Sequence, residues 1–359
     1  MNTNKHFAPL TILGIMSGTS LDGLDIALCD FWKEEQIFHY KILKTQTFSF
    51  PQELSQKLRR LFNSSALYLC QVEVEFSNFT AQCVTRFLER SEKQPHYIAS
   101  HGHTVFHQPE NGLTKQIGIG AIIASQTGIS TICDFRTTDV ALGGQGAPLV
   151  PIGDALLFPQ YDGCLNLGGI ANISHYHSKI STAYDISLCN IPLNFLSKQF
   201  GLQYDKDGAL AQRGIIHSKL LEALNKPDYF SKNGAKSIGY EFFEKYYLPL
   251  FDTFSISNED KLRTMCEHIA MQIAYHLKGL HTVLLTGGGT KNRFLVKLIK
   301  EKTNTKIVIP KRQLIDFKEA LLFAFLGYLR VYGATNCLHS VTGATRDSCG
   351  GAIYSGLMD

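Results

Sequence analysis

The sequence predicts an α/β protein with two domains, and three observations support this prediction. The chain has 359 residues, which is long for a single hydrophobic core. Two segments about 150 residues apart each contain an apolar run, a turn with glycines and a second apolar run, which is the pattern of a strand hairpin. A third segment, near the C-terminus, places three glycines between a buried strand and a helix. Strands that alternate with helical stretches favour sheets covered by helices.

The composition is that of a globular protein, with 44% hydrophobic and 18% charged residues. The net charge of +4 comes from 35 basic and 31 acidic residues, a balance that argues against a nucleic-acid partner. The nine cysteines form no Cys-x-x-Cys pair, which favours reduced thiols and a cytoplasmic location. No apolar run approaches the length of a membrane span, so we expect no membrane partner.

The first hairpin spans residues 13–28, and its tip consists of glycine, hydroxyl and carboxylate residues. Glycines such as Gly18 and Gly23 let backbone N–H groups turn outward and let a ligand approach the main chain. The tip can therefore hold phosphate, while Asp22 or Asp25 can hold a hydrated magnesium ion. The alternative interpretation is an ordinary Asp-Gly hairpin turn.

Three histidines follow a short strand at residues 97–100. His101, His103 and His107 suggest a metal site, because residues two apart on a strand share a face. No carboxylate or cysteine nearby completes such a site. Polar groups that line a cleft, or that are hydrogen-bonded in the core, are therefore the competing interpretation, and the sequence leaves a metal role open.

A charged cluster and a glycine-rich stretch at residues 134–148 indicate a hinge or a substrate loop around Arg136. The alternative is a solvated surface loop with Arg136 in a salt bridge. We place the domain boundary here, with one domain at 1–145 and the other at 146–359. The sequence leaves open whether the C-terminal segment packs back on the first domain.

The second half opens with another glycine-tipped hairpin, at residues 164–174. Its likeness to the first hairpin suggests an internal duplication. Asp185 then ends a short strand just before a helix that begins near Asn190. A carboxylate at this place faces the crevice in which open α/β sheets bind ligands, although a helix cap is the alternative. The triple glycine precedes a helix from about Asn292, and such a junction suits a phosphate or a flat ligand.

The two hairpins and the late triple glycine resemble the actin-like ATPase superfamily. That resemblance implies two actin-like domains of ribonuclease H-like fold with a nucleotide cleft between them. More specifically, the chain resembles the anhydro-N-acetylmuramic acid kinase family from near residue 10 to its end. The most specific motifs are Ala141-Leu142-Gly143-Gly144-Gln145-Gly146-Ala147-Pro148-Leu149 and Leu165-Asn166-Leu167-Gly168-Gly169-Ile170-Ala171-Asn172. The other matching stretches are 16–25, 101–109, 134–151, 184–194, 204–214, 236–243, 286–292, 319–327 and 340–344.

The resemblance implies an enzyme of peptidoglycan recycling that uses ATP and Mg²⁺. Water would open the ring of 1,6-anhydro-N-acetylmuramic acid while O6 accepts the γ-phosphoryl group, giving N-acetylmuramic acid 6-phosphate. Asp185 would be the general base, and Asp22 would hold the metal through water. The ATP-binding residues would be Gly18, Thr19, Ser20, Leu21, Asp22, Gly23, Asp25, Gly168, Gly169, Gly287, Gly288, Gly289 and Asn292. The sugar-binding residues would be Arg136, Glu319, His101 and Asn190. A homodimer is common in the family and is left open here.

One departure from the family bears on the substrate. Where the family has Asp-Thr-Gly-Pro-Gly-Asn, this chain has Asp185-Ile186-Ser187-Leu188-Cys189-Asn190. A smaller change places His103 where the family usually has glutamine. Two alternatives therefore stay open: a kinase of a different sugar, and a catalytically weakened nucleotide-binding relative.

Overall fold

The computed structural model describes residues 7–18, 21, 23–177, 180–232 and 236–356. The chain divides into two compact units, and each is described by itself. The first unit comprises Met1–Phe158 and Phe317–Asp359, and the second comprises Pro159–Asp316. The α/β fold in two parts that the sequence predicts is thereby confirmed.

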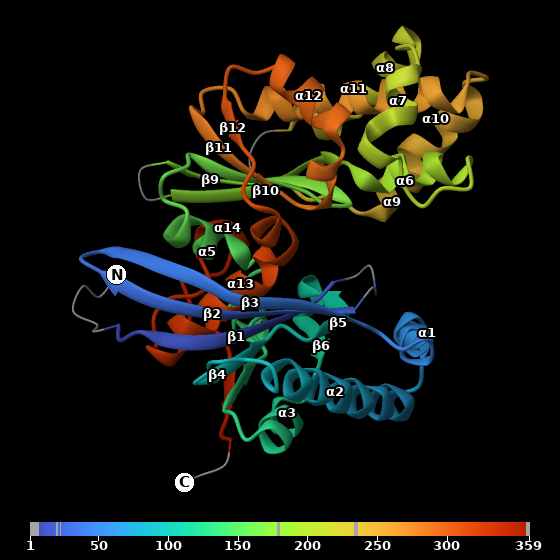
Figure 1. Ribbon diagram of the computed structural model, residues 1–359. Coiled ribbons are helices and arrows are strands. Elements are labelled where there is room, and N and C mark those ends of the chain that lie inside the picture. The colour runs from blue at the N-terminus through green and yellow to red at the C-terminus, as the bar shows by residue number, and fades with distance from the viewer. Residues whose placement is uncertain (1–6, 19–20, 22, 178–179, 233–235, 357–359) are drawn as a thin grey trace. The chain divides into compact units, whose positions relative to one another are not determined.

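The first unit is built on a six-stranded sheet with the order β13-β7-β4-β1-β2-β3 (Figure 1). Its strands are β1 (Leu10–Ser17), β2 (Gly23–Glu34), β3 (Ile37–Ser49), β4 (Tyr97–Ser100), β7 (Thr131–Cys133) and β13 (Ala352–Tyr354). Strands β1, β2 and β3 are antiparallel neighbours, whereas β4 is parallel to β1 and β7 is parallel to β4. Strands β5 (His103–Gln108) and β6 (Leu113–Ile117) form a separate hairpin.

Helices cover both faces of this sheet. They are α1 (Gln52–Arg60), α2 (Ala66–Leu88), α3 (Gly120–Thr127), α4 (Thr137–Ala141), α5 (Val150–Leu157), α13 (Arg312–Val331) and α14 (His339–Thr342). Leu13 and Ile15 join the apolar cluster formed with α2 on one face. Gly14, between them, faces α13, because the side chains of a strand alternate between its two faces. A Cβ on Gly14 would lie 1.9 Å from the carbonyl oxygen of Ala320.

The division between the units falls inside α13. Phe317 has φ −121° and ψ 16°, which is not helical, and the residues from Phe317 onward belong to the first unit. The first unit also continues to Phe158, past the division that we expected after residue 145. The Phe158 ring packs edge-on against Tyr40 of β3 at 5.7 Å, which fixes the end of α5 to the first sheet.

The second unit contains a five-stranded sheet with the order β10-β9-β8-β11-β12. Its strands are β8 (Gly163–Leu167), β9 (Ile170–His177), β10 (Ile180–Leu188), β11 (Thr282–Thr286) and β12 (Lys306–Val308). Strands β8, β9 and β10 are antiparallel neighbours, and β11 is parallel to β8 and to β12. Five strands of the first sheet, β3-β2-β1-β4-β7, have the same order and relative directions as the five strands of the second sheet. This shared topology agrees with the duplication that the two hairpins suggest.

The helices of the second unit pack around its sheet and bury a large apolar cluster. They are α6 (Asn190–Lys198), α7 (Ala209–Arg213), α8 (Ser218–Asn225), α9 (Tyr240–Phe242), α10 (Leu248–Thr253), α11 (Asn258–His276) and α12 (Arg293–Glu301). The remaining short elements are 3₁₀ turns η1 (Leu61–Asn63), η2 (Pro109–Asn111), η3 (Lys206–Gly208), η4 (Asp228–Ser231) and η6 (Gly288–Lys291), and a π-helical segment, η5 (Phe243–Tyr247).

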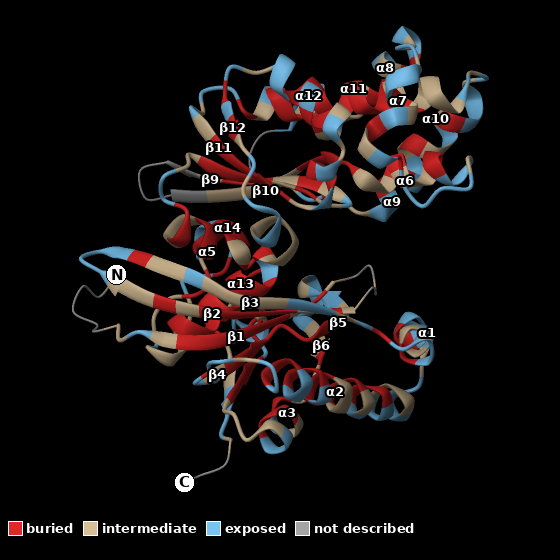
Figure 2. Ribbon diagram, viewed as in Figure 1, coloured by how far each residue is buried: buried red, intermediate tan, exposed pale blue. Residues whose placement is uncertain are grey.

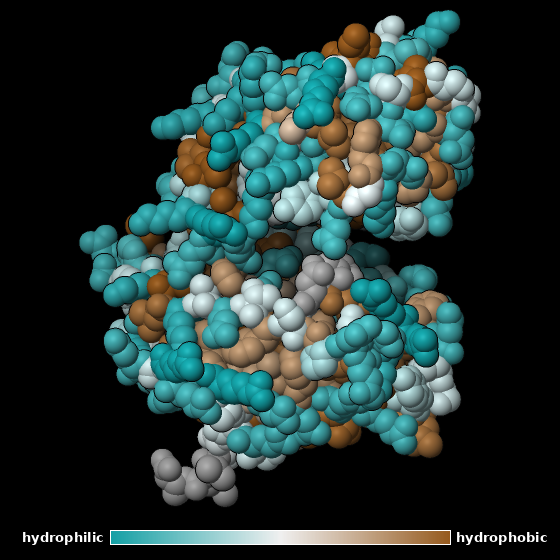
Figure 3. All heavy atoms as spheres, turned by 45° about the vertical axis from the view of Figure 1, so that its right-hand side comes forward, coloured by the Kyte–Doolittle hydropathy of each residue, from teal (hydrophilic) through white to brown (hydrophobic). Residues whose placement is uncertain are grey.

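Figure 2 shows that the buried residues follow the strands and the sheet-facing sides of the helices within each unit. The face seen in Figure 3 carries mostly hydrophilic side chains, with apolar residues in scattered groups. Among the described residues, no helix is both long and apolar enough to cross a membrane.

Candidate active site

The first hairpin places its glycine-rich tip between β1 and β2. Leu21 has φ +58° and donates its N–H to the carbonyl oxygen of Gly18 at 3.3 Å, so the chain turns sharply at this point. Gly23 admits no side chain, because a Cβ there would lie 2.2 Å from the Phe48 carbonyl oxygen. Asp25 follows in β2 and accepts a hydrogen bond from the Thr47 hydroxyl at 2.5 Å. The predicted ATP-binding residues Thr19, Ser20 and Asp22 lie outside the described residues.

The second hairpin joins β8 to β9, and its two glycines contact the start of α6. Cys189 donates its N–H to the Gly169 carbonyl oxygen at 2.8 Å, and Asn190 donates its N–H to the Gly168 carbonyl oxygen at 3.1 Å. The Asn190 side chain also donates to the Leu167 carbonyl oxygen at 3.3 Å. Asn190 is thus held against the glycine turn that follows β8.

The triple glycine follows β11, which is the parallel neighbour of β8. The two glycine turns therefore lie side by side at the carboxyl ends of these strands. Gly287 has φ +88°, and a Cβ there would lie 2.5 Å from Asn166 Oδ1. A Cβ on Gly289 would lie 2.7 Å from Leu167 Cβ. Gly288 differs, because nothing lies within 4 Å of its Cβ position, which leaves space for a ligand to approach the main chain.

The structure therefore brings six of the predicted site residues together at the carboxyl ends of β8 and β11: Gly168, Gly169, Asn190, Gly287, Gly288 and Gly289. Asn292 has a local structural role, because its Oδ1 accepts the Leu295 N–H at 2.9 Å and caps α12.

Asp185 lies in β10, beside a β-bulge. It pairs with Asn172 of β9, and the register then shifts so that Ile186 is skipped. Bulges of this kind re-aim side chains and are frequent next to active sites. The Asp185 Oδ2 accepts the Ile238 N–H at 3.0 Å. Burial raises the pKa of this carboxyl from 3.8 to about 6, although the Ile238 hydrogen bond opposes the shift. Asp185 can thus change its protonation state near neutral pH.

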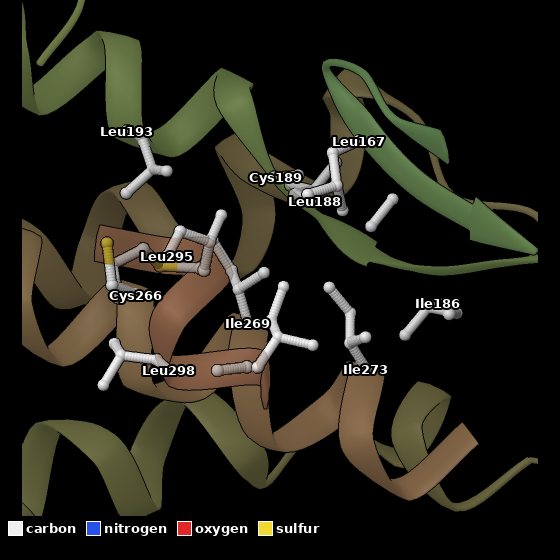
Figure 4. Packing of buried hydrophobic residues seen from close by; sticks show 14 of the residues in the cluster. Leu167, Ile186, Leu188, Cys189, Leu193, Cys266, Ile269, Ile273, Leu295 and Leu298 are labelled. Carbon is white, nitrogen blue, oxygen red and sulfur yellow. The ribbon is translucent and has the colours of Figure 1, made fainter. Parts of the chain in front are cut away.

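The residues that depart from the family pattern point into the core of the second unit. Ile186, Leu188 and Cys189 are each 0% exposed and belong to its apolar cluster. Figure 4 shows Leu188 and Cys189 beside Leu167, with Ile186 farther along the same apolar cluster, to which Ile273 of α11 also belongs. Their bulk fills the interior of this unit.

In the first unit, the half-buried Arg136 and the buried His101 form a polar cluster. Arg136 donates to His101 Nε2 from Nε at 3.0 Å, and its Nη1 donates to the Gly146 carbonyl oxygen at 2.6 Å. The His101 Nδ1 lies 2.9 Å from the Gly102 carbonyl oxygen, an arrangement that suits a neutral ring with its proton on Nδ1. Burial and the guanidinium hold the pKa of His101 well below its usual value.

Glu319 belongs to the same electrostatic environment. Its charge interacts with those of Lys318, Asp25 and Arg136. Burial in turn lowers the pKa of Arg136 to about 10, and the Glu319 carboxylate opposes that change. Three of the four predicted sugar-binding residues, Arg136, His101 and Glu319, thus lie together in the first unit, whereas Asn190 lies at the glycine turns of the second.

The three histidines of the 101–107 segment contact different partners. His103 Nδ1 lies 3.1 Å from the Ser17 hydroxyl, and His107 Nδ1 lies 3.1 Å from the Thr114 hydroxyl. Within the described part of the chain, no three His, Cys, Asp or Glu side chains come together as metal ligands would.

Sequence reasoning missed one carboxylate of this region. Asp139 is 1% exposed, and its Oδ2 accepts the Gly146 N–H at 2.8 Å. Its Oδ1 accepts from the Thr342 hydroxyl at 2.8 Å, so it ties the glycine-rich loop to the C-terminal segment. The acidic residue stood inside the glycine-rich stretch of the sequence, but its partners are too distant in the chain for a pattern to show them.

Two α/β units of shared topology, with glycine turns at their strand ends, agree with the two-domain ATP-dependent kinase that the sequence predicts. Residues 10–356 match the sequence profile described as anhydro-N-acetylmuramic acid kinase. The chain belongs to the anhydro-N-acetylmuramic acid kinase family.

Two relatives illustrate the similarity. The anhydro-N-acetylmuramic acid kinase of Sulfurimonas denitrificans is 34% identical over 367 residues, covering 95% of this chain and 98% of the relative. That of Vibrio parahaemolyticus is also 34% identical, over 96% of this chain and 98% of its own length. Among solved structures, component A of the Acidaminococcus fermentans (R)-2-hydroxyglutaryl-CoA dehydratase has a TM-score of 0.47 and 11% identity, covering 89% of this chain and 98% of that one. That structural similarity is too distant to carry an argument.

Proposed function

We propose that this protein opens the 1,6-anhydro ring of anhydro-N-acetylmuramic acid and phosphorylates the released O6, in the recycling of peptidoglycan. The family match over residues 10–356 supports the substrate class. The observation that carries the chemistry is the carboxyl of Asp185, which is half-buried beside a bulge and has one oxygen on a backbone N–H. A carboxyl in that setting is the general base that attack by water requires.

In the proposed reaction, the oxygen of water forms a bond to the anomeric carbon and gives its proton to Asp185. The bond from the anomeric carbon to O6 breaks, and O6 takes the γ-phosphoryl group, so that ADP and N-acetylmuramic acid 6-phosphate are the products. Phosphoryl transfer depends mostly on positioning and charge neutralisation. Arg136, Glu319 and His101 supply a cation, an acid and a neutral ring for the sugar hydroxyl, amide and carboxylate groups.

The glycine turns are the proposed ATP-binding elements. The open space at Gly288 and the absence of room for a side chain at Gly287 suit a ligand that lies against the main chain. At the first hairpin, Gly18, Leu21 and Gly23 give the turn its shape. Asp22 would hold Mg²⁺ through water, since carboxylate oxygens suit this ion and its hydration shell. The ion would neutralise charge on the phosphates.

Both alternatives depend on the segment after Asp185. A kinase of a different sugar, or a weakened relative, would be favoured if its bulky residues lined a ligand site. The full burial of Ile186, Leu188 and Cys189 in the core of the second unit instead supports the anhydro-sugar kinase.

The test is product analysis in oxygen-18 water with Mg-ATP and 1,6-anhydro-N-acetylmuramic acid. We expect the label on the anomeric hydroxyl and phosphate on O6, and the loss of both products with Asp185→Asn. ATP binding without a sugar product would refute the assignment, and a panel of other sugars would then separate the two alternatives. We also propose a cytoplasmic location, which the nine free cysteines support. A homodimer stays a prediction.

A further inference from the structure

Asp185 lies on the outer edge of its sheet, because β10 is the terminal strand. An outer edge leaves N–H and C=O groups without a strand partner. At Asp185 these groups are satisfied by residues of the segment that follows α8. The Asp185 N–H donates to the Lys236 carbonyl oxygen at 3.0 Å, and the Tyr229 hydroxyl donates to the Asp185 carbonyl oxygen at 2.7 Å.

The pattern of these bonds differs from that of an ordinary strand pair. There, a main-chain N–H of the neighbouring strand would satisfy the carbonyl oxygen. Here, the nearby N–H of Ile238 donates to the Asp185 carboxylate at 3.0 Å. The Tyr229 hydroxyl donates to the Asp185 carbonyl oxygen in place of the Ile238 N–H. The tyrosine therefore lets a backbone N–H hold the carboxylate without leaving the half-buried carbonyl unpaired.

The Tyr229 hydroxyl is itself held in place. Lys236 Nζ donates to the carbonyl oxygens of Tyr229 at 3.2 Å and Lys232 at 3.0 Å, and it lies 4.8 Å from the centre of the Tyr229 ring. The same ring packs edge-on against Phe242 at 5.5 Å. Among the described residues, Asp185 Oδ1 has no hydrogen-bond partner, so this oxygen is left for a proton.

We propose that Tyr229 is a positioning residue for Asp185, and that Tyr229, Lys236 and Ile238 form a clasp that directs Asp185 Oδ1 toward the attacking water. This inference rests on the proposed role of Asp185 as the base. The clasp holds three of the four polar atoms of Asp185, namely its backbone nitrogen, its carbonyl oxygen and Oδ2, and leaves Oδ1 to react. A base held in one orientation loses less entropy on reaching the transition state, so its positioning contributes to kcat.

The test compares Tyr229→Phe with the matched control Tyr246→Phe, whose ring also packs on Phe242, at 4.5 Å. With Mg-ATP and 1,6-anhydro-N-acetylmuramic acid, we expect Tyr229→Phe to lower kcat about tenfold and to change the KM for ATP less than about twofold. The Ile238 hydrogen bond lowers the pKa of Asp185, so a loosened clasp should move the acid limb of the pH–rate profile to higher pH. Tyr246→Phe should change neither quantity.

The double variant Asp185→Asn/Tyr229→Phe separates this proposal from the proposed function. If the clasp acts through Asp185, the double variant should have the same residual activity as Asp185→Asn alone. Equal effects of Tyr229→Phe and Tyr246→Phe would overturn the clasp and leave the base assigned. A fully active Asp185→Asn variant would overturn both. A fall in kcat that is the same at every pH and in both Asp185 backgrounds would show a purely structural role for Tyr229, and would also overturn the clasp.

Discussion

Replacing Asp185 by asparagine should remove catalysis and at the same time stabilise the protein. The burial that suits this carboxyl to act as a base makes its ionised form unfavourable. Its pKa is raised from 3.8 to about 6, and each unit corresponds to about 1.36 kcal/mol, so the charge costs up to about 3 kcal/mol at pH 7.5. Asparagine has a similar shape and an Oδ1 that can still accept the Ile238 N–H, but it carries no charge.

The pH dependence of this effect has a defined sign. Between pH 3.8 and 6 the unfolded chain releases the Asp185 proton while the folded chain retains it. The folded state thus binds more protons, and the free energy of unfolding of the unsubstituted protein falls as the pH rises through this window. We therefore expect Asp185→Asn to add about 1 kcal/mol at pH 4.5 and about 3 kcal/mol at pH 7.5. The same ionisation should give kcat/KM an acid limb near pH 6, with a tenfold loss per pH unit below it.

Urea unfolding of both proteins at pH 4.5 and 7.5 measures the stability difference, and ADP release coupled to product analysis measures activity. The expected activity loss is about 10²–10⁴-fold, as for removal of a general base. Asp228→Asn, at an exposed position of the same unit, is the control and should change neither stability nor activity. A stability gain that is equal at the two pH values would refute the linkage argument, and a variant with normal turnover would refute the role as base.

Three further substitutions, one of them paired with a control substitution, test other parts of the structure. Arg136→Lys should lower kcat/KM for the sugar about 10²-fold in steady-state assays, because lysine cannot reproduce the guanidinium geometry; an unchanged value would contradict sugar binding at this cluster. Gly287→Ala should weaken ATP binding at least about tenfold by titration calorimetry, since φ is +88° and a side chain would meet Asn166. The control is Gly279→Ala, where φ is +84° but the Cβ position is open; it should cost only about 1 kcal/mol of stability and leave ATP affinity intact. Equal ATP affinities for the Gly287 and Gly279 variants would contradict the assignment. Gly14→Ala should lower the free energy of unfolding by about 3 kcal/mol, because its Cβ would lie 1.9 Å from a carbonyl oxygen of α13; a normal unfolding midpoint would show that the helix can shift.

The features that sequence reasoning recovered are local ones. An apolar run predicts β1 and alternating apolar residues predict β2, and the glycines that follow β8 and β11 mark the turns at the ends of those strands. The sequence placed Asp185 at the end of a strand shortly before a helix, whereas the structure places it inside β10, which continues to Leu188 before α6 begins at Asn190. Such patterns arise from backbone sterics and from the periodicity of strands and helices, which neighbouring residues determine among themselves.

Contacts between distant parts of the chain needed the tertiary structure. Tyr229 and Ile238 reach Asp185 across 44 and 53 residues, and Arg136 reaches His101 across 35. The bulky segment after Asp185 suggested an altered substrate pocket, but packing places it in the core of the second unit. Residues 317–359 belong to the first unit, because α13 covers the face of its sheet where Gly14 leaves room. These outcomes depend on which surfaces meet when the elements pack, and local sequence patterns do not specify that.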